Sequence, residues 1–87
     1  SQYQQAYQSY LKSKDRFDYF NNSALSNAAL ILKNSRLAYQ NGEIGYTEYL
    51  LNLKQVNTIQ ENHLLAMLEL NQSINKIEYL IGYSQTL

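Results

Sequence analysis

The stretch Tyr39-Gln40-Asn41-Gly42-Glu43-Ile44-Gly45-Tyr46-Thr47-Glu48-Tyr49-Leu50 decides the fold, because it holds both signals for a reversal of the chain. Gly42 suits the position just past a helix end, where a left-handed backbone costs little without a Cβ. Gly45 suits the N-cap of a second helix, with Glu48 reaching back to the Gly45 amide. Ile44 and Tyr49 have the spacing of a hydrophobic staple around that cap. So short a connection forces the two helices to pack side by side and antiparallel.

Little else in the sequence interrupts a helix. The 87 residues contain no proline, and the third glycine is Gly82, where the second helix is expected to stop. The sequence therefore predicts an all-α fold, a long antiparallel two-helix coiled-coil hairpin that forms one unit over residues 1–87. The first helix is expected over about 2–41, the turn over 42–45, the second helix over about 46–82 and a frayed tail over 83–87.

Apolar residues along the first helix recur at steps of three and four, the spacing of a seam against a partner helix. The series is Tyr3, Tyr7, Tyr10, Phe17, Ala24, Ala28, Ile31 and Ala38, interrupted by Lys14, Asn21 and Ser35. A second series, offset by one position, contains Leu11, Leu25, Ala29, Leu32 and Tyr39. The apolar arc is thus wider than two helices need, which indicates neighbours on two sides.

The weakest part of the first helix is Asn21-Asn22-Ser23, whose side chains compete for backbone hydrogen bonds. We expect the helix to continue through it, with a kink as the alternative. The second helix carries its own apolar series, which runs from Tyr46 through Leu53, Val56, His63 and Met67 to Ile81. Two helices alone give a core one layer deep, so the hairpin should associate into a larger bundle or wall of helices.

Several classes of function are not supported by the sequence. Seven basic and seven acidic residues, without a basic run, predict no nucleic-acid binding. No apolar stretch reaches the roughly 20 residues that cross a bilayer, so we expect no direct membrane contact by this segment. His63 is the single histidine and cysteine is absent, so we predict no metal site and no cofactor. No nucleophile, base and orienting group occur together, and we predict that the chain is not an enzyme.

Other groups have simple structural interpretations. We interpret His63 as a residue near the seam whose polar end reaches water. Lys14 and Asp18 have the spacing of an ion pair on an exposed, charged turn of the helix. The acidic residues of the predicted tip leave two interpretations open. Glu43 and Glu48 stabilise the helix start, form a contact surface together with Ile44 and Tyr46, or do both.

The pattern Tyr39-x-x-Gly42-x-x-x-Tyr46-x-Glu48-x-Leu50 resembles the TolC-type outer-membrane efflux factors. The resemblance extends to Asn71-x-x-Ile74-x-x-x-Glu78-x-Leu80-Ile81-Gly82 and covers about residues 19–82. Within that family, Tyr39-Gln40-Asn41-Gly42-Glu43-Ile44 and Glu48-Tyr49-Leu50 resemble the branch that works with heavy-metal pumps of the resistance-nodulation-division class. Ile44 stands where some relatives have a basic residue, and Gly45 stands where many have Ser or Asp.

The resemblance implies a homotrimeric channel of a tripartite efflux pump that exports heavy-metal cations. The channel would consist of a short β-barrel in the outer membrane, continued by a barrel of α-helices across the periplasm, and each subunit would supply two helical hairpins. This segment would be the lower part of the second hairpin, and would thus be a fragment of a longer protein. Its tip would dock to the periplasmic adaptor protein, and the inner-membrane pump is fused to the same chain in some members. The implied adaptor-contact or channel-entrance residues are Tyr39, Asn41, Gly42, Glu43, Ile44, Gly45, Tyr46 and Glu48.

A second hypothesis needs no channel. The hairpin would be a self-associating coiled-coil scaffold or adaptor module that pairs into an antiparallel four-helix bundle and binds a helical partner. Amphipathic strands of about ten residues in the same parent chain would favour the channel.

Overall fold

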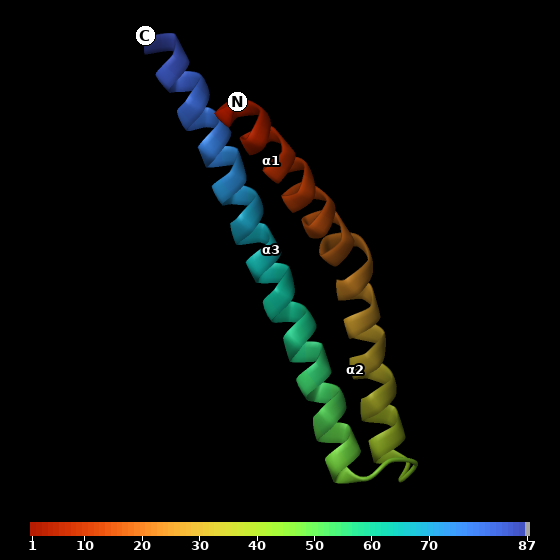
Figure 1. Cartoon of the computed structure of the whole chain (residues 1–87). Helices are drawn as coiled ribbons and strands as arrows, with labels where there is room; N and C mark the ends of the chain where they lie inside the picture. Colours follow the sequence, from red (N-terminus) through yellow and green to blue (C-terminus); the bar gives the residue numbers. More distant parts are fainter. Residues whose placement is uncertain (87) are drawn as a thin grey trace.

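The computed structural model describes residues 1–86 and contains two antiparallel helical arms (Figure 1). The first arm consists of α1 (Gln2–Tyr19), the short π-helical segment η1 (Phe20–Ala24) and α2 (Leu25–Gln40). The second arm is α3 (Tyr46–Thr86), and no strand is present among the described residues. The rod measures 67 × 17 × 15 Å. The predicted all-α antiparallel hairpin is confirmed.

The core between the arms is one layer deep and consists mainly of small side chains. Its buried members are Ala6, Ala24, Ala28, Ser35, Val56, Ala66 and Leu80. Small residues at a helix–helix contact let the two backbones approach closely, because the spacing of packed helices depends on the side chains between them. Ser35 is the polar member, and its hydroxyl accepts a hydrogen bond from Asn52 Nδ2 at 2.9 Å. A core this thin leaves many large apolar side chains on the surface.

The first arm does not break at its predicted weak point, but its hydrogen bonding changes there. The Leu25 amide donates to the Phe20 carbonyl, which lies one residue farther back than in an α-helix. The continuity that we predicted for residues 21–23 is confirmed, with a π-helical turn in place of a break. In Figure 1 the arm changes direction at this turn, between α1 and α2.

The π-helical turn shifts the face of the first arm that meets α3. Ala6, Ser13 and Phe20 are buried or half-buried and lie seven residues apart. The same row of contacts continues at Ala28, eight residues after Phe20, and then at Ser35, seven residues later. A π-helical turn holds one residue more than an α-helical turn. The single interval of eight therefore coincides with the extra residue.

The shift keeps polar side chains out of the core. A regular series of steps of three and four, continued from Ala24 toward the N-terminus, passes through Asn21 and Lys14. A buried and unpaired ammonium group costs roughly 3–5 kcal/mol. With the π-helical turn, half-buried Phe20 and Ser13 occupy the places of Asn21 and Lys14. The turn thus resolves a conflict between the helical repeat and the polarity of two residues.

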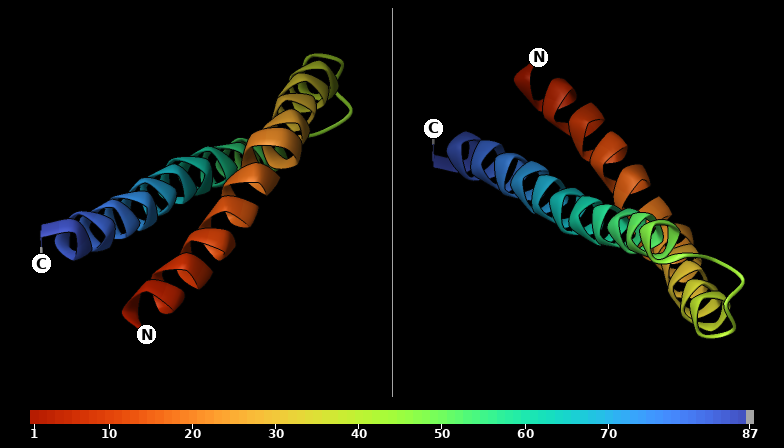
Figure 2. Two further views of the ribbon diagram at one scale, coloured as in Figure 1. Left: turned by 90° about the horizontal axis from the view of Figure 1, so that it is seen from above. Right: turned by 90° about the horizontal axis from the view of Figure 1, so that it is seen from below.

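The predicted seam is therefore wrong at its N-terminal end. Tyr3 and Tyr7 are 49% and 44% exposed, whereas Tyr10 and Phe17 are half-buried as expected. Both views of Figure 2 show that the N-terminal end of α1 and the C-terminal end of α3 diverge. The π-helical turn rotates α1 about its own axis, and this rotation turns Tyr3 and Tyr7 away from the contact with α3.

The predicted stop at Gly82 is also wrong, because α3 continues to Thr86. Gly82 has no positive φ, so it does not adopt the backbone conformation that ends a helix at glycine. Glycine inside a helix costs only about 1 kcal/mol relative to alanine, and extension of an existing helix is favourable. The expected frayed tail is thus helical over residues 83–86, and Leu87 lies outside the described residues.

Candidate interaction site at the hairpin tip

The reversal of the chain is built by backbone hydrogen bonds around Gly42. The Gly42 amide donates to the Tyr39 carbonyl at 3.1 Å, and the Glu43 amide donates to the Ala38 carbonyl at 2.8 Å. These two bonds close the end of α2 as a Schellman motif. Gly42 has a φ of +74°, the left-handed conformation expected from the sequence. The predicted helix end at this glycine is confirmed.

The start of α3 agrees only partly with the predicted cap. The Tyr49 amide donates to the Gly45 carbonyl at 3.0 Å, so Gly45 is the N-cap residue. Within residues 1–86, the Gly45 amide does not donate to the Glu48 side chain, and that predicted bond is wrong. A capping box needs a side chain on the N-cap residue for its reciprocal bond, which glycine lacks. The Glu48 carboxylate stays in water.

Three tyrosines join the two arms just behind the turn. The rings of Tyr39 and Tyr49 stack at a centroid distance of 4.7 Å and an interplanar angle of 8°. Tyr46 lies 6.1 Å from Tyr39 with its ring tilted by 45°. Sequence reasoning missed Tyr49 as a member of the tip. The sequence does contain a signal for this contact, because Tyr39 and Tyr49 are equally far from Ile44, at the reversal of the chain.

The other predicted tip residues are brought together on the surface. Asn41, Gly42, Glu43, Gly45 and Glu48 are exposed, Tyr46 is 62% exposed and Ile44 is half-buried. From residue 37 to residue 53, Glu43 and Glu48 are the charged residues of the sequence. In the described part of the chain neither carboxylate forms an ion pair. The tip therefore presents two carboxylates and an exposed aromatic ring, a combination suited to binding a partner.

Two other predictions from the sequence concern His63 and the pair of Lys14 and Asp18. His63 is half-buried and lies near the seam, as predicted. Its ring centroid lies 5.6 Å from that of Phe17, and its Nε2 contacts Asn21 Oδ1 at 3.4 Å. The predicted pair of Lys14 and Asp18 is confirmed at 3.0 Å. The hydrogen bond and the negative charge of Asp18 raise the pKa of Lys14 above its ordinary value. No cluster of three or more potential metal ligands occurs among residues 1–86.

Comparison with protein-family models, with curated proteins and with solved structures gives no match for this chain. In the described part of the chain, no helix has the length and apolar character needed to span a membrane. The tip geometry is therefore the main basis for a functional proposal.

We expect the Tyr39–Tyr49 stack to contribute a measurable coupling energy. Tyr39→Leu and Tyr49→Leu keep apolar bulk at the base of the turn but remove the stacked rings. A double-mutant cycle from chemical denaturation should give about 0.5–1.5 kcal/mol between the two positions, the range for aromatic pairs. The same cycle with Tyr39 and Tyr19 is the control, since Tyr19 lies on α1, far from the turn. Equal coupling in both cycles would contradict a specific role for the stack.

Proposed function

We propose that this chain is a periplasmic hairpin of an outer-membrane channel in a tripartite efflux pump, with its tip docking to the periplasmic adaptor protein. The observation that carries the proposal is the shape of the tip, in which a hydrogen-bonded turn at Gly42 presents unpaired carboxylates at the end of a 67 Å rod. Together with the sequence pattern around Gly42, this shape supports contact from end to end with another elongated protein. The role is one of interaction, and no catalytic step is proposed.

The sides of the rod support a place in a wall of helices. The exposed large aliphatic residues outside the tip include Leu30, Leu37, Leu51, Leu64, Leu65 and Leu68. Exposed leucines in this number on a pair of helices favour an interface with further helices, because a core one layer deep cannot cover them. In the proposed channel, neighbouring hairpins of a homotrimer would cover these leucines. The exported cargo would be heavy-metal cations, selected by an inner-membrane resistance-nodulation-division pump on a separate chain or on the same one.

The same leucines also favour a second candidate, a self-associating coiled-coil scaffold outside any channel. In an antiparallel four-helix bundle of two hairpins, the leucines would be buried between copies and the tips would stay free. The two candidates therefore differ in what contacts the tip. In the channel the tip meets a different protein, whereas in the scaffold it meets water or another copy.

Photo-cross-linking in the cells that produce the protein tests this difference. A benzophenone amino acid replaces Glu43 at the tip in one variant and Glu61 in the other, since both glutamates are exposed but Glu61 lies midway along α3. We expect Glu43→benzoylphenylalanine to give an adduct with a periplasmic adaptor. Glu61→benzoylphenylalanine should give adducts with copies of the same protein and none with the adaptor. Adducts between copies from the tip, or none, would contradict docking and favour the scaffold.

A further inference from the structure

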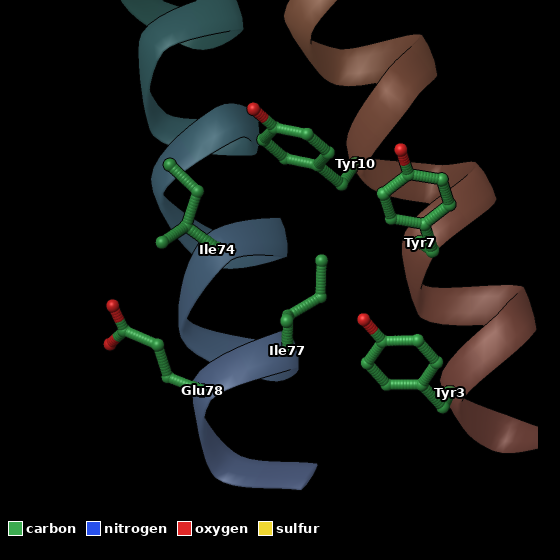
Figure 3. A pocket seen from close by; sticks show the side chains of 6 residues that line it. All are labelled: Tyr3, Tyr7, Tyr10, Ile74, Ile77 and Glu78. Carbon is green, nitrogen blue, oxygen red and sulfur yellow. The ribbon is translucent and has the colours of Figure 1, made fainter. Parts of the chain in front are cut away.

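An apolar groove runs between α1 and α3 at the end of the rod opposite the tip. It encloses about 410 Å³ and is lined by Tyr3, Tyr7, Tyr10, Ile74, Ile77 and Glu78 (Figure 3). The three tyrosines form the wall on α1, and Ile77 points between α3 and those rings. The groove plays no part in the proposed contact at the tip.

Both walls of the groove repeat at helical spacing. Tyr3, Tyr7 and Tyr10 follow one another at steps of four and three on α1. On α3, Ile74 and Ile77 line the groove, and Ile81 continues their row and is 42% exposed. Two facing apolar rows at steps of three and four suit an amphipathic helix, because its own side chains fit between them at the same intervals. The groove therefore has the periodicity of a site for a third helix.

The π-helical turn creates this groove. Because the turn shifts the face of α1, small Ala6 contacts α3 while Tyr3 and Tyr7 stand outside the seam. The opposite side of the same seam is polar, with a smaller hollow lined by Gln2, Gln5, Ala6, Ser9, Ser73 and Lys76. One side of the splayed end is thus apolar and the other is hydrophilic. Single-turn π-helices are frequent at functional sites, in agreement with a binding role for the apolar side.

The charge at the rim of the groove indicates which charge a partner would carry. Glu78 stands on the outer rim of α3, and its carboxylate points away from the three tyrosines (Figure 3). Among residues 1–86, Glu78 forms no ion pair, and no basic residue lines the groove. A carboxylate on the rim suits a salt bridge with the flank of a helix that lies along the groove. The Glu78 carboxylate does not suit a small cation held between the tyrosine rings, because it points away from those rings.

We propose that this groove binds an amphipathic helix of a partner protein, with leucine or isoleucine inserted between the two rows and a lysine or arginine beside Glu78. The groove lies at the far end of the rod from Gly42, so this inference does not depend on docking of the tip. A failed test here would leave the tip proposal unchanged, and the reverse also holds.

Isoleucine methyl spectra of the whole chain give a direct test. The sequence has six isoleucines, of which Ile74 and Ile77 line the groove, Ile81 continues their row, and Ile31, Ile44 and Ile59 lie elsewhere. The probe is a synthetic helix of about three heptads with leucine at positions a and d and arginine at e and g, where like charges disfavour its self-association. Titration should shift the methyl signals of the first three isoleucines and leave the other three unchanged.

Matched variants separate apolar fit from charge. Tyr7→Ala should weaken binding of the arginine peptide about tenfold, as for a central aromatic contact. Tyr19→Ala removes another exposed tyrosine of α1 outside the groove and should leave the affinity unchanged. Glu78→Gln should weaken the arginine peptide about two- to fivefold, as expected for a partly exposed ion pair. It should not affect a peptide with glutamine at e and g. Helix content by circular dichroism confirms that each variant is folded.

Three results would overturn the proposal. The first is no shift, or equal shifts in all six isoleucines. The second is tighter binding of a peptide with glutamate in place of arginine. The third is the appearance of the same shifts when the chain alone is concentrated, which would make the groove a contact between two copies of this chain.

Discussion

Replacing Lys14 and Asn21 together by leucine is expected to remove the π-helical turn and to rotate α1 against α3. The two polar residues occupy the places at which a regular series of steps of three and four would pass through the core. With leucine there, an unbroken α-helix buries both new side chains as well as Tyr3 and Tyr7. Each buried leucine contributes about 1.5–3 kcal/mol, offset in part by exposure of Phe20. We expect a net gain of about 1–3 kcal/mol in the free energy of unfolding.

The structure of this variant checks the prediction directly. The amide of Leu25 should donate to the carbonyl of position 21 instead of Phe20, and Tyr3 and Tyr7 should become buried against α3. For a domain of this size, the gain corresponds to a rise of roughly 4–8 °C in Tm per kcal/mol. Lys12→Leu with Asn22→Leu makes the same chemical change at two exposed positions that lie outside the row through Lys14 and Asn21 and outside the row through Ser13 and Phe20. A π-helical turn that persists in the Lys14/Asn21 variant would show that polarity is not its cause.

The same variant connects the fold to the groove. If α1 rotates as expected, the tyrosine wall disappears and the arginine peptide should lose its binding site. The Lys12/Asn22 control should keep binding. Loss of binding in the control as well would indicate that added leucine disturbs the groove by itself.

The fold was largely predictable because its decisive signals are local. Gly42 acts through its own backbone conformation, and a short connection leaves two long helices no arrangement other than side by side. The seam from the end of η1 into α2 was also predictable, since Ala24 and Ala28 follow a regular repeat there. These features need only the identity and spacing of neighbouring residues.

The features that sequence reasoning missed depend on competition between distant parts of the chain. The sequence shows that Asn21 is polar and that the helix is weak around it. The π-helical turn, however, depends on which of two faces of α1 packs better against α3. The groove at Tyr3 and Tyr7 follows from that comparison and was therefore missed. The sequence predicts a helix stop at Gly82 because glycine allows one. Whether glycine ends a helix depends on its φ, which residue type alone does not fix.

The candidate tip was predictable as a set of residues but not as a set of contacts. Six of its members, from Asn41 to Tyr46, lie at or beside the reversal and are adjacent in sequence. The stack of Tyr39 on Tyr49 depends on ring orientations across the turn, and a bond from the Gly45 amide to Glu48 depends on the side-chain rotamer of Glu48. Such details follow from geometry that residue spacing does not determine.

Gly42→Val is expected to lower the free energy of unfolding by about 1–2 kcal/mol and to weaken the proposed contact at the tip. A Cβ at this position meets nothing within 4 Å, so the cost comes from the backbone and not from a clash. Residues with a Cβ lose about 1–2 kcal/mol in the left-handed region, and a β-branched side chain is particularly unfavourable there. If the backbone relaxes instead, the bonds from the Gly42 and Glu43 amides are lost.

Two further substitutions separate conformation from side-chain size in thermal unfolding. Gly42→Asn should cost less than Gly42→Val, because asparagine enters the left-handed region more readily. Gly45→Ser should be neutral or stabilise the hairpin by a few tenths of a kcal/mol, because Gly45 has no positive φ and serine is a better N-cap than glycine. Gly42→Val should also reduce adaptor cross-linking from position 43, since Glu43 moves with the turn. Equal effects of valine at 42 and serine at 45 would contradict the turn geometry, because only position 42 requires a left-handed backbone.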